Sequence, residues 1–489
     1  MPLDTVARYL HTIAHRGGDG LSVFSTDGVS GGFTRLAIQD VSGASMQPLH
    51  RGSKMLLYNG ELYGQAFETS DGPELLRLLD EYGPPVLGAV YGEYAGVLYD
   101  FQSRQLTVFR DATGVRPLFT GRMPNGTLCF ASEAKALDES CSVIAQVPPN
   151  TLHKFDYSGK LVSQARIHPQ LYSQPPSYCS SPWDRVRSAV RLGQAIVRSV
   201  RMRCRSDRPV GCFLSGGLDS SLVATLVARE RRRLNMDPPR LYTVAFDTGS
   251  TDLPQAQAVA DALGLPLTVI RITLEEAANA LFYVVQSLES ACVTTVRAST
   301  PMWLMCKWIK SNTDTRVLFS GEGADELAGG YRYFLNAPSA MAANDESVRL
   351  LKNLHLYDNL RVDRCAAAFG LEVRIPLLDH AVIRTYRQMS MRDMNAVGGI
   401  EKRALRRAAA LLMPDSPVVW RQKEALSDGA GYGWVDWLRE RFGDMHKEHM
   451  HYTTLLYGLG RYGLVKQCWM PQWSESTDPS ARFLNKASV

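Results

Sequence analysis

The sequence lacks the features that mark secreted, membrane-spanning and zinc-stabilised proteins. No apolar run approaches the ~18 to 20 residues that cross a bilayer, and no charged segment followed by an apolar core opens the chain. The 9 cysteines are widely spaced and form no C-x-x-C pair, which favours reduced thiols and argues against structural zinc. These absences predict a soluble, cytoplasmic protein with no membrane partner.

A strong excess of charge of one sign is also missing. The chain carries 54 basic and 49 acidic residues, and a formal net charge of +5 over 489 residues is too small to imply nucleic-acid binding. The densest basic run, 229–233, follows a helical apolar stripe and is interpreted as a solvated helix end. A hydrophobic fraction of 45% and a charged fraction of 21% are those of an ordinary folded protein, and the length predicts two domains.

The chain changes character near residue 166. Before it, short β-like segments alternate with turns, with one helix expected at 74–81, and this pattern predicts a mainly β domain of two packed sheets. After residue 182, strands alternate with helices, which predicts a parallel sheet with crossover helices and ligands beyond the carboxyl ends of its strands. We therefore expect a first domain at 1–165, a proline-rich linker at 166–182 and a second domain at 183–489.

The strongest chemical signal lies between an apolar strand, 210–214, and a helix with one apolar face. Glycines let a backbone fold around an anion, hydroxyls and amides donate to it, and a helix N-terminus adds a favourable dipole. The segment has no G-K-[ST] and is not a Walker loop, and a simple capped turn is the alternative. The predicted phosphate-binding residues are Ser215, Gly216, Gly217, Leu218, Asp219, Ser220 and Ser221.

Two further segments carry candidate catalytic groups. A second strand is followed by Ser320 and Gly321 and then by the carboxylates Glu322, Asp325 and Glu326, which suit a phosphate-bridging metal or a general base rather than an acidic surface turn. The third segment, 420–429, contains Lys423, a cation able to neutralise charge on a transferring group. Without the other two segments, a lysine beside a glutamate would be interpreted as part of a solvent-exposed ion pair.

Together these segments resemble the asparagine synthetase family. The likeness extends, in order and spacing, to VTTVRAS at 293–299, YDNLR at 357–361, GLEVRIPLLDH at 370–380, WMP at 469–471 and TDPSAR at 477–482, and so covers nearly the whole chain. The resemblance implies an α/β protein with an N-terminal glutaminase-like antiparallel β-sandwich and a C-terminal parallel-sheet ATP-pyrophosphatase domain with a helical extension.

The resemblance also implies the chemistry. A carboxylate of aspartate or a related small acid attacks the α-phosphate of ATP, pyrophosphate leaves, and ammonia or another amine displaces AMP from the acyl-adenylate. Asp219 and Asp325 would bind Mg2+, the 215–221 loop with Ser320 and Gly321 would bind ATP and pyrophosphate, Glu322 would assist proton removal from the amine, and Lys423 would stabilise adenylation. The implied substrate-binding residues are Cys292, Thr294, Thr295, Arg297 and Asp379. A homodimer is possible by family analogy.

The chain departs from the family at its start. Glutamine-dependent members begin Met-Cys, whereas this sequence begins Met1-Pro2-Leu3-Asp4, and no cysteine precedes Cys129. The matching glutamine-pocket positions remain, namely Arg35, Asn59, Gly60, Glu61 and Asp71. Two explanations stay open: loss of glutaminase activity, or a record that omits the true beginning. As written, the chain should not hydrolyse glutamine.

A second departure lies beside the implied amino-acid pocket. Ala291 and Cys292 stand where the family has a tyrosine and an aspartate, which indicates either a changed acid or tolerated drift behind the pocket. The favoured function is amide formation with ATP and Mg2+. The alternatives are an ordinary glutamine-dependent synthetase with its start missing, a lactam-forming or cyclising ligase, disfavoured by a glutamate where lactam-forming relatives carry tyrosine, and a non-catalytic ATP-binding homologue, disfavoured by the intact set Asp219, Glu322, Asp325 and Lys423.

Overall fold

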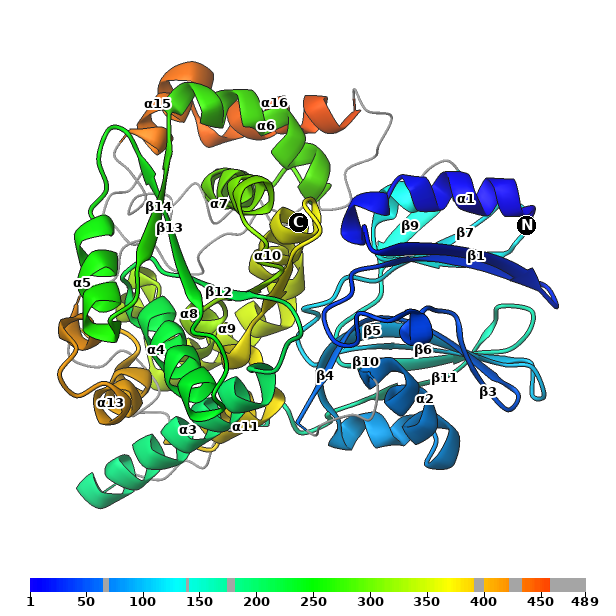
Figure 1. Cartoon of the computed structure of the whole chain (residues 1–489), viewed down its shortest axis with the longest axis horizontal. Helices are drawn as coiled ribbons and strands as arrows, with labels where there is room; N and C mark the ends of the chain where they lie inside the picture. The colour runs from blue at the N-terminus through cyan, green and yellow to red at the C-terminus, as the bar shows by residue number, and fades with distance from the viewer. Residues whose placement is uncertain (65–69, 138–139, 174–180, 391–399, 422–432, 458–489) are drawn as a thin grey trace.

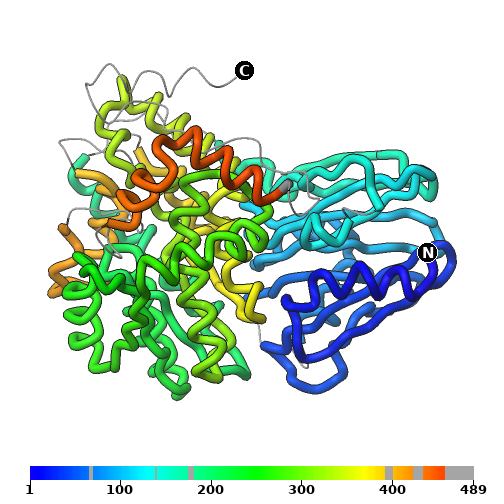
Figure 2. Tube along the Cα trace, turned by 90° about the horizontal axis from the view of Figure 1, so that it is seen from above, coloured from blue at the N-terminus to red at the C-terminus, as the bar shows by residue number. Residues whose placement is uncertain are grey.

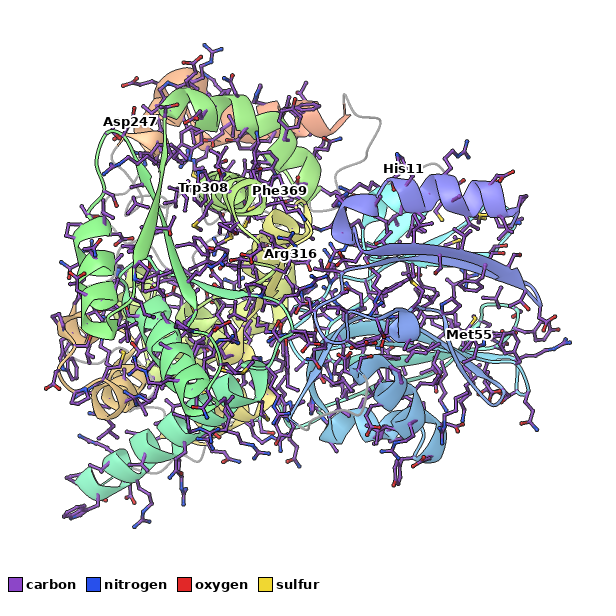
Figure 3. All side chains as sticks on the ribbon, viewed as in Figure 1. His11, Met55, Asp247, Trp308, Arg316 and Phe369 are labelled. Carbon is purple, nitrogen blue, oxygen red and sulfur yellow. The ribbon has the colours of Figure 1, made fainter. Side chains whose placement is uncertain are left out.

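The chain folds into two parts that lie side by side, a β-rich part and an α/β part, in a computed structural model (Figure 1). The structure describes residues 1–64, 70–137, 140–173, 181–390, 400–421 and 433–457. Side chains fill the region where the two parts meet (Figure 3).

The β-rich part is built on a six-stranded antiparallel sheet with the order β11-β10-β6-β5-β4-β3. Its central strands pair along their whole length, and leucines on one face pack against Leu75, Leu76 and Leu79 of a helix, α2 (Asp71–Glu81). The strands are β3 (Leu49–Arg51), β4 (Lys54–Tyr63), β5 (Tyr91–Asp100), β6 (Gln105–Arg110), β10 (Thr151–Phe155) and β11 (Leu161–Arg166).

The opposite layer consists of two smaller sheets covered by α1 (Leu3–His11). One is a ribbon of β1 (Gly20–Thr26) and β2 (Val29–Arg35), and the other has the order β8-β7-β9, formed by β7 (Phe119–Arg122), β8 (Leu128–Ala131) and β9 (Val143–Gln146). Figure 1 shows this layer on one side of the six-stranded sheet. The antiparallel β character expected from the sequence is confirmed, although the second layer is divided into two sheets.

The α/β part contains a five-stranded parallel sheet with the order β14-β13-β12-β15-β16. Its central strands have wholly buried apolar residues because helices cover both faces, as the alternation of strands and helices predicted. The strands are β12 (Val210–Phe213), β13 (Arg240–Phe246), β14 (Leu267–Ile272), β15 (Val317–Phe319) and β16 (Glu372–Arg374).

The helices of this part surround the sheet and extend beyond it. In Figure 2 the last described helix, at the red end of the colour scale, lies across α6 and α7, with which it is in contact. The helices are α3 (Pro182–Arg203), α4 (Leu218–Arg233), α5 (Leu253–Leu263), α6 (Leu274–Leu288), α7 (Val293–Asn312), α8 (Ala324–Ala328), α9 (Ala340–Asn353), α10 (Asp358–Ala367), α11 (His380–Arg387), α13 (Arg403–Leu412), α15 (Trp434–Phe442) and α16 (Met445–Tyr457). None of the described helices is both long and apolar enough to span a membrane.

Buried ion pairs join the two parts. Arg374 of β16 contacts Glu61 of β4 at 2.6 Å, Arg203 of α3 contacts Glu93 of β5 at 3.1 Å, and Asp363 of α10 accepts from Arg16 at 2.9 Å. Buried charges are costly unless they are paired, so these contacts specify how the two parts dock.

One sequence interpretation needs correction. The basic run 229–233 is not simply a solvated helix end, because Glu230 and Arg231 are buried and the Arg231 guanidinium donates to the carbonyl oxygens of Cys204 and Asp237. In the described part of the expected linker, Ile167 and Leu171 are buried.

Candidate active site

Two glycine-containing loops meet at the carboxyl ends of neighbouring parallel strands. The first follows β12 and leads into α4, and the second follows β15 and leads into α8. A Cβ on Gly321 would lie 2.7 Å from the carbonyl carbon of Asp219, so the backbones approach so closely that only glycine fits there. The structure thus brings together the first two motifs recognised in the sequence.

The first loop is folded tightly around its own hydroxyl groups. The Ser215 and Ser220 hydroxyls lie 3.0 Å apart, and the Gly217 amide donates to Ser215 Oγ at 3.3 Å. Gly216 has φ +76°, and a Cβ there would lie 2.4 Å from the Ala256 nitrogen. The loop leads directly into the N-terminus of the long helix α4. Backbone amides and the helix dipole favour the binding of a phosphate there.

Not every residue of the predicted phosphate loop presents its side chain there. Leu218 is 6% exposed and Ser221 is wholly buried, because both belong to the face of α4 that packs on the sheet. For these two positions, only the backbone amides remain available to an anion.

Asp219 and Asp325, the two residues expected to bind magnesium, converge on one cation of the protein. Lys402 Nζ contacts an oxygen of Asp219 and lies 2.6 Å from Asp325 Oδ1. Both aspartates stand in the first turn of a helix, α4 and α8 respectively. Burial lowers the pKa of Lys402, but the two carboxylates raise it by more, so its pKa lies above the ordinary value and the side chain is an ammonium ion.

The carboxylates fit the expected magnesium ion. The described residues contain no group of three or more His, Cys, Asp or Glu side chains arranged to hold a metal. Magnesium bound together with a nucleotide needs only one or two carboxylates, since phosphate oxygens and water complete its shell. An ammonium ion already occupies the space between Asp219 and Asp325, so this space favours positive charge.

Glu322, the expected general base, lies in the second loop, close enough to Asp325 for that carboxylate to influence its pKa. Its Oε2 accepts from Arg361 at 2.8 Å, and Arg361 is also paired with Asp358 at 2.9 Å. Burial raises the pKa of Glu322 above its ordinary value, although the Arg361 guanidinium opposes this. A carboxylate with a raised pKa is better matched to accepting a proton near neutral pH.

Glu326 belongs to a different environment from Asp325. It is 2% exposed, and its side chain accepts a hydrogen bond from the hydroxyl of Tyr331. Burial and the neighbouring carboxylates Asp358 and Asp325 raise its pKa well above the ordinary value. The sequence grouped the three carboxylates of this loop, whereas the structure directs Glu326 into the protein.

The expected acid-binding residues lie at the start of α7 and are partly engaged already. Cys292 is wholly buried and its Sγ is 3.4 Å from Thr294 Oγ1, while Thr295 is 3% exposed. The guanidinium of Arg297 is paired with Glu448 of α16, with a Nε to Oε1 distance of 3.0 Å. Among these residues, half-buried Thr294 is the most accessible.

Asp379 does not join this group. Its carboxylate contacts Arg203 at 2.8 Å and caps α11 through the Ala381 amide, at the junction of the two parts. Arg203 and this cap are the contacts of the Asp379 carboxylate, and they favour a structural role over the substrate role expected from the sequence.

The five expected glutamine-pocket positions line one cavity of about 860 Å³, whose wall belongs mostly to the β-rich part and is completed by residues of α10 and β16. Burial, and then Glu61, raises the pKa of Asp71 to about 6. Burial acts in the same direction on Glu61, but Arg374, Glu372 and Arg116 together outweigh it and hold the pKa of Glu61 at about 2. Arg35 donates to the carbonyl oxygens of Ser42 and Asp40. The pocket residues in the wall are Arg35, Asn59, Gly60, Glu61 and Asp71.

Cys129 of β8 also lines this cavity. Burial, and then its neighbour Cys141, raises the pKa of the Cys129 thiol to about 12. A thiol that stays protonated is a weak nucleophile, so Cys129 is not suited to attack glutamine.

Lys423 lies outside the described residues, as do the segments 469–471 and 477–482. Sequence reasoning missed Lys402 and Arg361 as groups of the site. Arg361 stands in a segment recognised in the sequence, where nothing linked it to Glu322. Lys402 follows Glu401 in an otherwise unremarked segment, and only the folded chain brings it to the two aspartates.

Comparison with known proteins gives matches along most of the chain. A family model described as asparagine synthase matches residues 191–349 and 335–478, and one described as a glutamine amidotransferase domain matches residues 2–181. An asparagine synthetase (glutamine-hydrolyzing) of Gallus gallus is 36% identical, covering 96% of this chain and 94% of the relative, and that of Homo sapiens is 35% identical with the same coverage. Asparagine synthetase B (glutamine-hydrolyzing) of Escherichia coli K12 is 36% identical, covering 87% of this chain and 79% of the relative.

Proposed function

Because the chain belongs to the asparagine synthetase family of AMP-forming carbon–nitrogen ligases, we propose that it adenylates aspartate or a related small carboxylic acid and transfers ammonia or another amine to it. The observation that carries this proposal is the meeting of the 215–221 loop with Asp219, Asp325 and Glu322 at one edge of the parallel sheet. Adenylation turns a carboxylate oxygen into part of a good leaving group, which a direct amidation lacks.

The first half of the reaction needs a binding site for the β- and γ-phosphates of ATP. The amides at the start of α4 and in the Ser215–Gly217 turn are suited to hold them, and Asp219 and Asp325 would hold Mg2+ against their oxygens. Bound magnesium neutralises charge on the departing pyrophosphate. Lys423 is proposed to stabilise the charge that develops at the α-phosphate.

The second half needs removal of a proton from the attacking amine. Glu322 is proposed to accept it, since burial raises its pKa and Arg361 fixes the orientation of its carboxylate at 2.8 Å. The amine nitrogen attacks the acyl carbon, Glu322 takes the proton that the nitrogen loses as the C–N bond forms, AMP leaves with the former carboxylate oxygen, and an amide remains.

For the nitrogen source we propose free ammonia or another amine. Among the described residues of the cavity wall, the thiol is that of Cys129, whose pKa of about 12 makes it a weak nucleophile toward glutamine. A second candidate, glutamine-dependent synthesis by a chain with a segment before Met1, is favoured by the retained cavity with Arg35, Asn59 and Asp71.

We infer the kind of acid that binds from the side chains at the start of α7. Cys292 and Ala291 offer no carboxylate to pair with a substrate ammonium, and the Arg297 guanidinium is held by Glu448. An acid that does not depend on an ammonium contact at this point would therefore compete with aspartate.

An isotope experiment tests the chemistry. Aspartate, and then each acid that supports turnover, is supplied with 18O in its carboxyl groups together with ATP, magnesium and ammonium. Adenylation transfers one 18O to AMP, which mass spectrometry detects. Production of ADP, or of AMP without 18O, would contradict the proposal, and AMP formed without an added amine would indicate a cyclising ligase.

A further inference from the structure

We propose that Lys402 is a positioning residue that stands in for the divalent cation between Asp219 and Asp325 in the nucleotide-free protein, so that magnesium enters the site only together with the polyphosphate of ATP. The inference deepens the proposed function, on which it rests. It concerns a residue of this chain that neither the recognised motifs nor the proposed chemistry uses.

The ammonium ion of Lys402 lies where a metal would bind. Its Nζ contacts Asp219 and lies 2.6 Å from Asp325 Oδ1, and the side chain is 2% exposed. Magnesium holds its oxygen ligands at about 2.0–2.1 Å in a strict octahedron. One Mg2+ and one ammonium ion cannot both sit between the same two carboxylates, so binding of the metal requires Lys402 to leave.

The backbone around Lys402 is fixed by a second buried cation. Lys402 has φ +56°, an uncommon left-handed conformation for a residue with a side chain, and it forms the N-cap of α13. Arg406 stabilises this turn, because its guanidinium donates to the carbonyl oxygens of Glu401 at 2.9 Å and Val419 at 2.6 Å. The contacts of Arg406 thus fix the backbone position of Lys402.

Gly330 leaves room for this arrangement. A Cβ at Gly330 would lie 1.9 Å from Asp325 Oδ1 and 2.1 Å from Lys402 Cε. Three separate segments, the start of α4, the 321–330 loop and helix, and the start of α13, therefore meet around one ammonium ion. This close packing distinguishes the contacts of Lys402 from surface ion pairs, which are exposed to solvent.

The charges explain why this lysine would link metal binding to nucleotide binding. Two carboxylates and one ammonium carry a net charge of −1, and a free Mg2+ would have to displace a paired, buried cation. A nucleotide triphosphate supplies negative oxygens that can receive the displaced ammonium, so the metal and the lysine then have separate partners. Lys402 thus keeps free divalent ions from the two carboxylates and holds these carboxylates close to each other.

Binding of Mn2+ alone tests the inference without any turnover. The purified full-length protein, with no nucleotide, acid or amine, is titrated with Mn2+, and free Mn2+ is measured by electron paramagnetic resonance. We expect Lys402→Met to bind one Mn2+ at least tenfold more tightly than the wild type, and Lys402→Met/Asp325→Asn to lose the gain. Lys402→Arg, which keeps the charge, should behave as the wild type.

Thermal unfolding covers the case in which Lys402→Met is poorly folded, because removal of the lysine leaves two carboxylates facing each other. We expect its melting temperature to fall in chelator and to recover with Mg2+, whereas Mg2+ alone leaves the wild type unchanged. Wild-type binding of Mn2+ that is as tight as that of Lys402→Met, or that Asp325→Asn abolishes, would overturn the inference. A folded Lys402→Met that gains no Mn2+ binding would also overturn it. The proposed ligase activity could fail in a separate assay with these binding results intact.

Discussion

At the scale of single residues, Glu322 carries the proposed amide-forming step. It is held by Arg361 at 2.8 Å, and burial raises its pKa. Glu322→Gln keeps the shape but cannot accept a proton, so we expect kcat for amide formation to fall about 10²- to 10⁴-fold. The measurement is the rate of amide product by mass spectrometry, with Glu74→Gln on the surface of α2 as the matched control. An unchanged rate in Glu322→Gln would remove this residue from the chemistry.

Gly330 offers a second test at this scale. Since a Cβ there would overlap both Asp325 Oδ1 and Lys402 Cε, Gly330→Ala should displace both, lowering the free energy of unfolding by about 1–3 kcal/mol. Urea unfolding measures this change. Gly43→Ala is the control, because a Cβ at Gly43 meets nothing within 4 Å. Equal stability of the two variants would contradict the close packing described around Lys402.

At the scale of elements, α10 connects the seam between the two parts with the candidate active site. Its Arg361 contacts Glu322, its Asp363 accepts from Arg16 at 2.9 Å, and its Arg364 lies 2.7 Å from Glu133 and 2.8 Å from Glu289. Three side chains of one helix thus fix its place between the loop after β15, the β-rich part and the end of α6.

Replacing Arg364 tests this role of α10. Arg364 is almost wholly buried, so Arg364→Met leaves Glu133 and Glu289 with fewer partners in a dry environment. Breaking a buried ion pair costs about 3–5 kcal/mol, which we expect as the loss in unfolding free energy from urea titration. Arg439→Met, which removes an exposed pair on α15, should change stability by less than about 0.5 kcal/mol. A similarly small effect for Arg364→Met would show that the pairing is not needed.

The elements also show what sequence reasoning can and cannot reach. The phosphate loop was predictable because glycines and serines between an apolar strand and a helix have a local meaning, and α4 begins there. The strand and helix alternation likewise gave the parallel sheet. Lys402 could not be found in this way, since it lies 183 residues from Asp219 along the chain and only the packing of α13 brings them together.

At the scale of the whole molecule, the docking of the two parts is a global property that no local pattern encoded. Glu61, predicted as a glutamine-pocket residue, lines the cavity, and its side chain is also paired with Arg374 of the other part at 2.6 Å. Asp379, predicted from the resemblance as a substrate ligand, has its carboxylate paired with Arg203 at 2.8 Å. The fold decides which buried partner each of these two carboxylates has, and a sequence motif does not identify that partner.

The same junction predicts a pH dependence of stability. His168 stacks on His380 with ring centroids 4.2 Å apart, beside Tyr91, Asp379 and the guanidinium groups of Arg384, Arg198 and Arg203. Burial, followed by the charge of His380, lowers the pKa of His168 to about 3. Burial also lowers the pKa of His380.

The direction in which stability changes with pH follows from proton linkage. In the unfolded chain both histidines bind protons below about pH 6.5, whereas the folded chain binds them only at lower pH, so stability is full above about pH 6.5 and falls as the pH decreases toward the folded values. We expect protonation of these two histidines to lower the free energy of unfolding by about 1–3 kcal/mol when the pH falls from 7.5 to 5.5. Urea titrations at both pH values measure this loss, and His168→Phe, which keeps a stacked ring, should reduce it by roughly half. An equal loss in His168→Phe would contradict the assignment to His168.

The central proposal is that this chain is an adenylating amide ligase that takes its nitrogen from free ammonia or another amine. It is tested most directly by pyrophosphate release from ATP and magnesium by the purified chain, with aspartate and then a panel of small carboxylic acids, each with ammonium and with glutamine. The account predicts turnover with ammonium and none with glutamine, and turnover with another acid but not aspartate would make Ala291 and Cys292 marks of a changed substrate. Equal turnover with glutamine, or no pyrophosphate with any acid, would contradict it.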